Sequence, residues 1–76
     1  MIHELDTVVL LRDIEEYGLV QGDVGAVVHC YEKGDAFEVE FVTAGGETVA
    51  LLTLLPEDIR PMGYKEILHV RELVAA

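Results

Sequence analysis

The fold is decided by residues 36–41, which read Ala-Phe-Glu-Val-Glu-Phe. Phe37, Val39 and Phe41 alternate there with small or charged residues. Because successive side chains of a strand point to opposite faces, this period of two predicts a strand with one dry and one wet face. We therefore expect Phe37, Val39 and Phe41 to lie in the core.

Turns flank this strand on both sides. Residues 32–35 read Glu-Lys-Gly-Asp and residues 43–46 read Thr-Ala-Gly-Gly, and glycine takes positive φ there at no steric cost. We expect neighbouring strands over 24–31 and 47–54. Gly25, inside the earlier of the two, predicts a bulge or sharp bend.

Two outer strands complete the predicted sheet. Residues 7–11 are short and apolar, and a long polar loop follows from Arg12 to Asp23. Residues 55–58 predict one helical turn with proline at its first position, followed by a short closing strand over 59–61. This pattern predicts a mainly β domain, a small five-stranded SH3-like barrel. An OB-fold is disfavoured, because no helix fits between Phe41 and Glu47.

The composition changes after Gly63. Residues 64–75 contain neither Pro nor Gly and carry apolar residues at three- and four-residue spacing, which predicts an amphipathic C-terminal helix. We therefore divide the chain into an SH3-like barrel over 1–61 and a C-terminal helix or tail over 62–76. The residues expected to pack on the barrel or to self-associate are Tyr64, Ile67, Val70 and Val74.

Two strands have more apolar residues than one interior can hold. The surplus residues are Thr7, Val9 and Leu11 on one strand and Ala50, Leu52 and Leu54 on the other. Such surface should be covered by the C-terminal helix, by a second copy of the chain or by another protein. A homodimer that uses the tail is therefore one expectation.

The charge of the chain is strongly negative. The 76 residues carry 15 Asp plus Glu and 5 Lys plus Arg, for a net charge of −10, and residues 1–61 alone carry −10. This charge repels nucleic acid and anionic membranes. No secretory signal or membrane span is visible, and the single Cys30 cannot form an internal disulfide, so we expect a cytoplasmic protein.

Acidic residues are the candidate partner-binding residues. They belong to the loop after the first strand and to the wet face of the sheet, where they could steer a basic protein to the domain. The alternative is that they serve only solubility. The candidates are Asp13, Glu15, Glu16, Glu38, Glu40 and Glu47.

No residue pattern indicates catalysis, a metal or a cofactor. His29 and Cys30 are adjacent in a strand and point to opposite faces, so they cannot chelate one ion together. The chain contains no serine, and nothing separates Glu38 and Glu40 into an acid and a base. We expect a protein that is not an enzyme.

Four separated segments carry a resemblance over about residues 2–61. They are residues 4–10 (ELDTVVL), 22–28 (GDVGAVV), 37–41 (FEVEF) and 58–61 (DIRP). Together they resemble a family of short acidic bacterial proteins classed as a domain of unknown function, which implies the same small barrel and no activity. The Gly-Asp-Val-Gly-x-Val-Val segment is also similar to KOW-type and nitrile hydratase β-subunit barrels, an analogy of fold.

Three functions remain as expectations. The first is a non-enzymatic protein-interaction module that engages a basic partner through its acidic face. The second is an accessory or regulatory subunit of an enzyme. The third, binding of nucleic acid through a KOW-like barrel, would need a basic groove that five basic residues can hardly build.

Overall fold

A computed structural model describes residues 1–73 of the chain, and it is mainly β. The predicted strands are present at the expected places, joined by loops and three single 3₁₀ turns. No α-helix occurs among the described residues. The strands are β1 (Thr7–Leu10), β2 (Val24–Cys30), β3 (Phe37–Val42), β4 (Thr48–Leu54) and β5 (Ile59–Pro61), and the turns are η1 (Glu15–Tyr17), η2 (Glu32–Gly34) and η3 (Pro56–Asp58).

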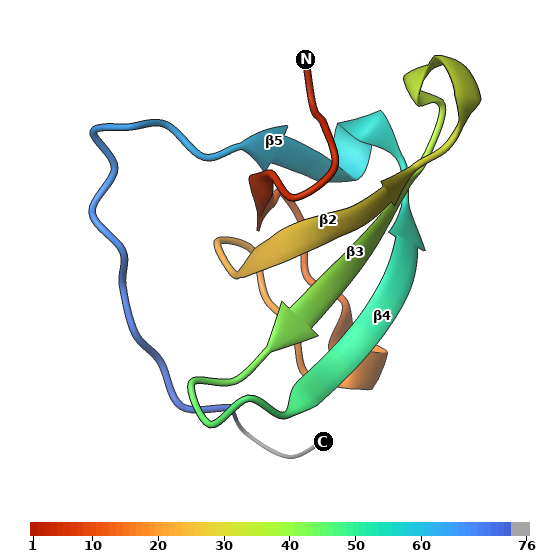
Figure 1. Cartoon of the computed structure of the whole chain (residues 1–76). Coiled ribbons are helices and arrows are strands. Elements are labelled where there is room, and N and C mark those ends of the chain that lie inside the picture. Colours follow the sequence, from red (N-terminus) through yellow and green to blue (C-terminus); the bar gives the residue numbers. More distant parts are fainter. Residues whose placement is uncertain (74–76) are drawn as a thin grey trace.

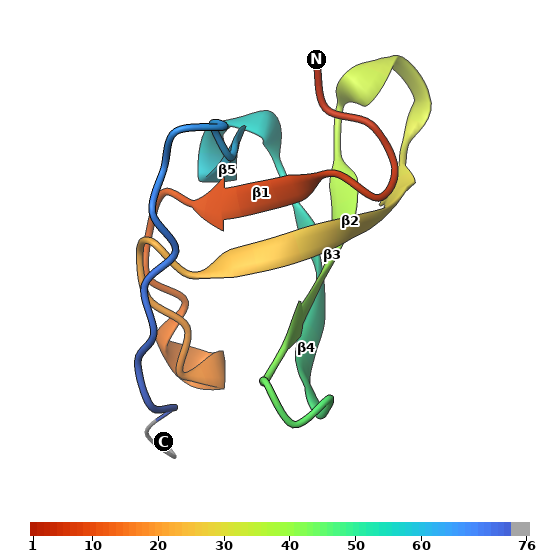
Figure 2. The same ribbon diagram turned by 60° about the vertical axis from the view of Figure 1, so that its left-hand side comes forward.

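The five strands form one antiparallel sheet in the order β4-β3-β2-β1-β5 (Figure 1). Consecutive strands are neighbours except β5, which returns through η3 to pair with β1. In Figure 2 the strands β1 and β2 cross the direction of β3 and β4, so the sheet wraps around its interior. The edge strands β4 and β5 do not pair with each other, and the sheet is therefore open rather than a closed barrel.

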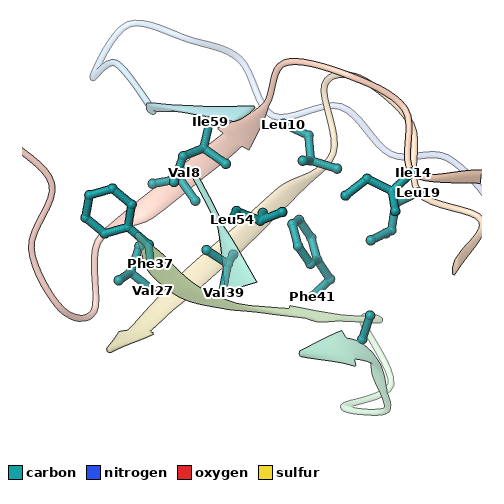
Figure 3. Packing of buried hydrophobic residues seen from close by; sticks show 11 residues of the cluster. Val8, Leu10, Ile14, Leu19, Val27, Phe37, Val39, Phe41, Leu54 and Ile59 are labelled. Carbon is teal, nitrogen blue, oxygen red and sulfur yellow. The ribbon is translucent and has the colours of Figure 1, made fainter. Parts of the chain in front are cut away.

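The interior of the sheet is built from the expected alternation. Phe37, Val39 and Phe41 are buried, which confirms the prediction for β3. Their side chains converge with Val8 from β1 and Val27 from β2 in Figure 3. Ile14 and Leu19, which form an isolated bridge in the β1–β2 loop, close one end of this core.

Gly25 has a different role from the bend that we expected. It pairs regularly with Val8, and the irregularity of β2 lies between Val27 and His29. A Cβ at Gly25 would lie 2.7 Å from Val39 Cγ1 and 2.9 Å from Phe41 Cε1. The glycine is therefore required because the side chains of β3 pack directly against its backbone.

The prediction that Ala50, Leu52 and Leu54 of β4 lie outside the core is wrong. The register pairs Phe37 with Leu54 and Phe41 with Ala50, so this set of β4 residues points into the core together with β3. Leu51 lies on the outer face instead and is 53% exposed. The surplus residue Val9 of β1 is buried, whereas Leu11, which follows the strand, remains exposed.

The predicted C-terminal helix is wrong for the residues that the structure describes. The chain turns at Tyr64 and Lys65 and continues to residue 73 without regular secondary structure, as a segment that bows away from the strands (Figure 1). A helix of about twelve residues is marginal in water unless an apolar face packs against something, and helical spacing does not supply that packing. One ion pair, Arg71 with Asp23, joins the far end of the segment to a residue 48 positions away, and a second, Arg60 with Glu66, joins its near end to β5.

Candidate functional site

Two candidate acids lie on the outer face of β3. Glu38 Oε1 accepts hydrogen bonds from Thr53 Oγ1 at 2.6 Å and from Tyr31 Oη at 3.2 Å. Glu40 Oε2 accepts one from Thr48 Oγ1 at 2.8 Å. These cross-strand bonds hold both carboxylates in place on a rigid strand while leaving them at the surface.

The remaining candidate acids lie in turns. Glu15 and Glu16 are exposed in η1, and Glu47 is exposed in the turn before β4. Asp13 accepts the Gln21 backbone N–H at 2.8 Å and shapes the β1–β2 loop. The candidates are therefore divided between the turns and the strand β3.

Three of the five basic side chains are committed to internal carboxylates. Arg12 pairs with Asp58, Arg60 with Glu66, and Arg71 with Asp23. Within residues 1–73, Lys33 and Lys65 form no ion pair. Twelve of the 15 acidic side chains therefore have no Arg or Lys partner in the described part of the chain. Their negative charge is not neutralised by such an ion pair within residues 1–73.

Asp58 is the one buried charged residue among those described, with 8% of its surface exposed. Its carboxylate accepts hydrogen bonds from Arg12 Nε at 2.8 Å and from the Leu55 N–H at 2.9 Å. Burial acts to raise the pKa of Asp58, but these bonds to the charged form outweigh it and lower the pKa below its usual value. Asp58 thus stays ionised and fixes η3 to the end of β1.

Residues 63–73 are here called the strap. A bidentate arginine–carboxylate pair fixes the strap at each end. At one end Arg60 donates to both oxygens of Glu66, at 2.8 and 2.7 Å, and the Gly63 N–H donates to the same carboxylate. At the other end Arg71 donates to both oxygens of Asp23 and to the Gly18 carbonyl. Bidentate pairs of this kind fix geometry as well as charge.

The carboxylates of the strap pairs are held in their ionised form. Hydrogen bonds from Arg60 and from the Gly63 N–H lower the pKa of Glu66 from 4.5 to about 2. For Asp23, burial opposes the shift, but the hydrogen bonds from Arg71 and the Val20 N–H lower its pKa. Both pairs therefore remain intact at neutral pH.

A cleft of about 700 Å³ lies between the strap and the sheet. Three valines of the outer face line it, and we call them the valine row: Val9, Val24 and Val42. Val24 and Val42 are 42% and 54% exposed, and the strap contributes Ile67 and Val70. The cleft was not predicted from the sequence, because its walls come from β1, β2, β3 and the strap, which are far apart in the sequence.

The tail residues predicted to pack are exposed. Tyr64 and Ile67 are fully exposed or nearly so, at 107% and 93%, and Val70 is 87% exposed. They do not pack on the core of their own chain, so the expected intramolecular packing is not seen, while self-association remains a prediction. Val74 lies outside the described residues.

The other sequence candidates lie at the opposite end of the sheet. His29 contacts Tyr31 edge to face and lies 3.5 Å from Glu4, while Cys30 Sγ faces the Ile2 carbonyl at 3.8 Å beside a second apolar cleft. Burial and the nearby acids raise the pKa of the Cys30 thiol. Among residues 1–73, no three metal-ligating side chains gather into a site.

A membrane-spanning helix is not found in the part of the chain that the structure describes. The observed features instead define a small, acidic β domain with an open five-stranded sheet and a pinned C-terminal strap. Residues 4–61 match the model of a domain of unknown function, DUF4926, and the chain belongs to this family. Neither a curated protein nor a solved structure matches the sequence.

Proposed function

We propose that this chain is a non-enzymatic protein-interaction module of SH3-like architecture that binds a basic protein through its acidic surface. The strand order, with β5 returning through one 3₁₀ turn to pair with β1, supports the SH3-like architecture. The observation that carries the function is the commitment of all three arginines to internal carboxylates. The outward field of the domain is therefore almost entirely negative, which favours a cationic partner and repels phosphate.

The acids on β3 are the best candidates to meet that partner. Glu38 and Glu40 are positioned by hydrogen bonds from neighbouring strands, so little side-chain freedom is lost when they bind. The acids of η1 are exposed on a loop and contribute to long-range attraction rather than to a defined contact.

The test uses the partner recovered from the source cell, purified, and bound to the isolated chain at low and high salt. We expect affinity to fall with salt and to fall further in the variant Glu38→Gln/Glu40→Gln than in the control Glu15→Gln/Glu16→Gln. Affinity that is the same at both salt concentrations would refute the electrostatic mechanism.

The identity of the recovered partner separates the proposal from its alternatives. A catalytic chain would indicate an accessory subunit of an enzyme. A gel shift of RNA or duplex DNA at low salt would indicate the nucleic-acid alternative, which the surface charge opposes.

A further inference from the structure

The cleft beneath the strap has an apolar floor in which Val9 is buried and Val24 and Val42 are left open. Val24 and Val42 remain exposed on the sheet side, and Ile67 and Val70 remain exposed on the strap side. Two bidentate ion pairs nevertheless fix the strap across this floor. Leu68 and Leu73 of the strap are less exposed than Ile67 and Val70, which together with Val24 and Val42 form an exposed apolar surface suited to contact with another molecule.

The charged residues around the cleft indicate which kind of molecule could bind there. Arg60 and Arg71 line it, but their guanidinium groups are already occupied by Glu66 and Asp23. Glu40 lies beside the valine row, because it pairs with Ala26, two residues from Val24 on β2, and is two residues from Val42 on β3. The two arginines and two carboxylates of the lining thus balance in charge, and Glu40, which has no Arg or Lys partner within residues 1–73, leaves a negative charge beside the apolar side chains that an occupant meets.

A second copy of the chain does not suit this site. It would bring another net charge of −10 against a surface of the same sign. A segment with apolar side chains between cationic residues matches both the floor and the surroundings. A volume of about 700 Å³ is within the range that accommodates a cluster of such side chains.

We propose that the strap cleft binds an apolar segment of a basic partner protein, with its apolar side chains against Val24, Val42 and Ile67 and a cationic side chain toward Glu40. This inference rests on the proposed function and assigns to it a defined binding site. The strap acts as one wall of the site, and the pairs Arg60–Glu66 and Arg71–Asp23 hold that wall in place.

The probe is a short synthetic peptide with central leucines flanked by lysines, compared with a matched peptide that has serines in place of the leucines. Binding to the full chain is followed by NMR chemical shifts of the isotope-labelled protein. We expect the leucine peptide to bind about tenfold more tightly or better, because each leucine buries apolar surface. Its shifts should cluster at the valine row and at residues 67–70.

Variants of exposed residues keep the test independent of folding. Ile67→Ser and Val70→Ser should each weaken the leucine peptide several-fold, while the control Tyr64→Ser, an exposed strap residue outside the cleft, should not. Equal affinity for the two peptides, or shifts that map to Glu38 and Glu40 alone, would overturn the cleft while leaving the acidic interaction surface supported. If neither peptide binds at low salt, the proposed preference for basic partners fails as well.

Discussion

Arg12 and Asp58 lie 46 residues apart in the chain, and Arg12 Nε donates a 2.8 Å hydrogen bond to Asp58 Oδ1. The Leu11 N–H donates to the backbone carbonyl of Asp58, and the Leu55 N–H donates to its side chain. Asp58 is thus the point at which the end of β1 and the turn η3 are joined. Its carboxylate serves the fold and is not available to a partner.

Substitution of this carboxylate should destabilise the domain. We expect Asp58→Asn to lower the free energy of unfolding by about 1–3 kcal/mol, because a buried acceptor of charged and backbone donors is replaced by a group that is half donor. Urea unfolding measures the change. The exposed neighbour provides the control, since Glu57→Gln should change stability by no more than about 0.5 kcal/mol. Equal effects of the two substitutions would contradict the assigned role.

The contribution of Asp58 should depend on pH in a defined direction. Its pKa in the folded chain is lowered from 3.8, so its stabilisation is fully present above that pH and is lost as the pH falls through the lowered folded value. We expect the stability difference between the native chain and Asp58→Asn to be constant near neutral pH and to shrink below about pH 4. Comparing the two proteins by urea unfolding cancels the general effect of protonating the other acids. A difference that grows in acid would show that the sign is wrong.

The pKa of Glu66 reports directly on the first strap pair. The pair with Arg60 and the Gly63 N–H bond lower it from 4.5 to about 2. In Arg60→Gln we expect the pKa of Glu66 to rise toward 4.5, as measured by NMR titration of its side-chain carboxyl carbon. Lys65→Gln is the control, because Lys65 forms no ion pair in the described part of the chain. A pKa of Glu66 that is unchanged in Arg60→Gln would mean that the pair does not form in solution.

The position of Gly25 can be tested by adding a single methyl group. Gly25→Ala places a Cβ 2.7 Å from Val39 Cγ1, 2.9 Å from Phe41 Cε1 and 3.0 Å from the Glu40 carbonyl. We expect a loss of about 1–3 kcal/mol in the free energy of unfolding, since the backbone carbonyl cannot move aside. Gly45→Ala is the matched control, because its nearest neighbour would be 3.7 Å away. It should leave stability unchanged or raise it slightly. If both substitutions are tolerated equally, the close packing at Gly25 is not real.

Local sequence patterns predicted the strands and much of the core, but not the contacts between distant segments. Alternation predicted that Phe37 and Phe41 are buried, because the charged residues between them can lie only on the solvent face of the strand. The inner face of β4 depends on its register with β3, which its nearly continuous apolar sequence does not determine.

The helix prediction for the C-terminal segment was wrong for a related reason. The spacing of Ile67 and Val70 fits a helix, yet the segment's course depends on Arg71 reaching Asp23, a residue 48 positions away. Long-range pairs of this kind carry no periodic signal in the sequence. The acidic surface could be predicted from composition, whereas the strap cleft required the three-dimensional structure.

The strap itself gives the last prediction. Because Ile67 and Val70 are largely exposed, the bonds from Arg71 to the partly buried Asp23 and to the Gly18 carbonyl are the main contacts that hold the end of the strap. Arg71→Gln should therefore release the strap while leaving the sheet folded. Heteronuclear NOE values of residues 67–73 should fall to those of a flexible chain, whereas the values of β1–β4 and the urea midpoint should barely change. Lys33→Gln, at the other end of the sheet, should alter neither. A strap that stays rigid in Arg71→Gln would mean that packing, not charge, holds it, and the open cleft beneath it would have to be closed in solution.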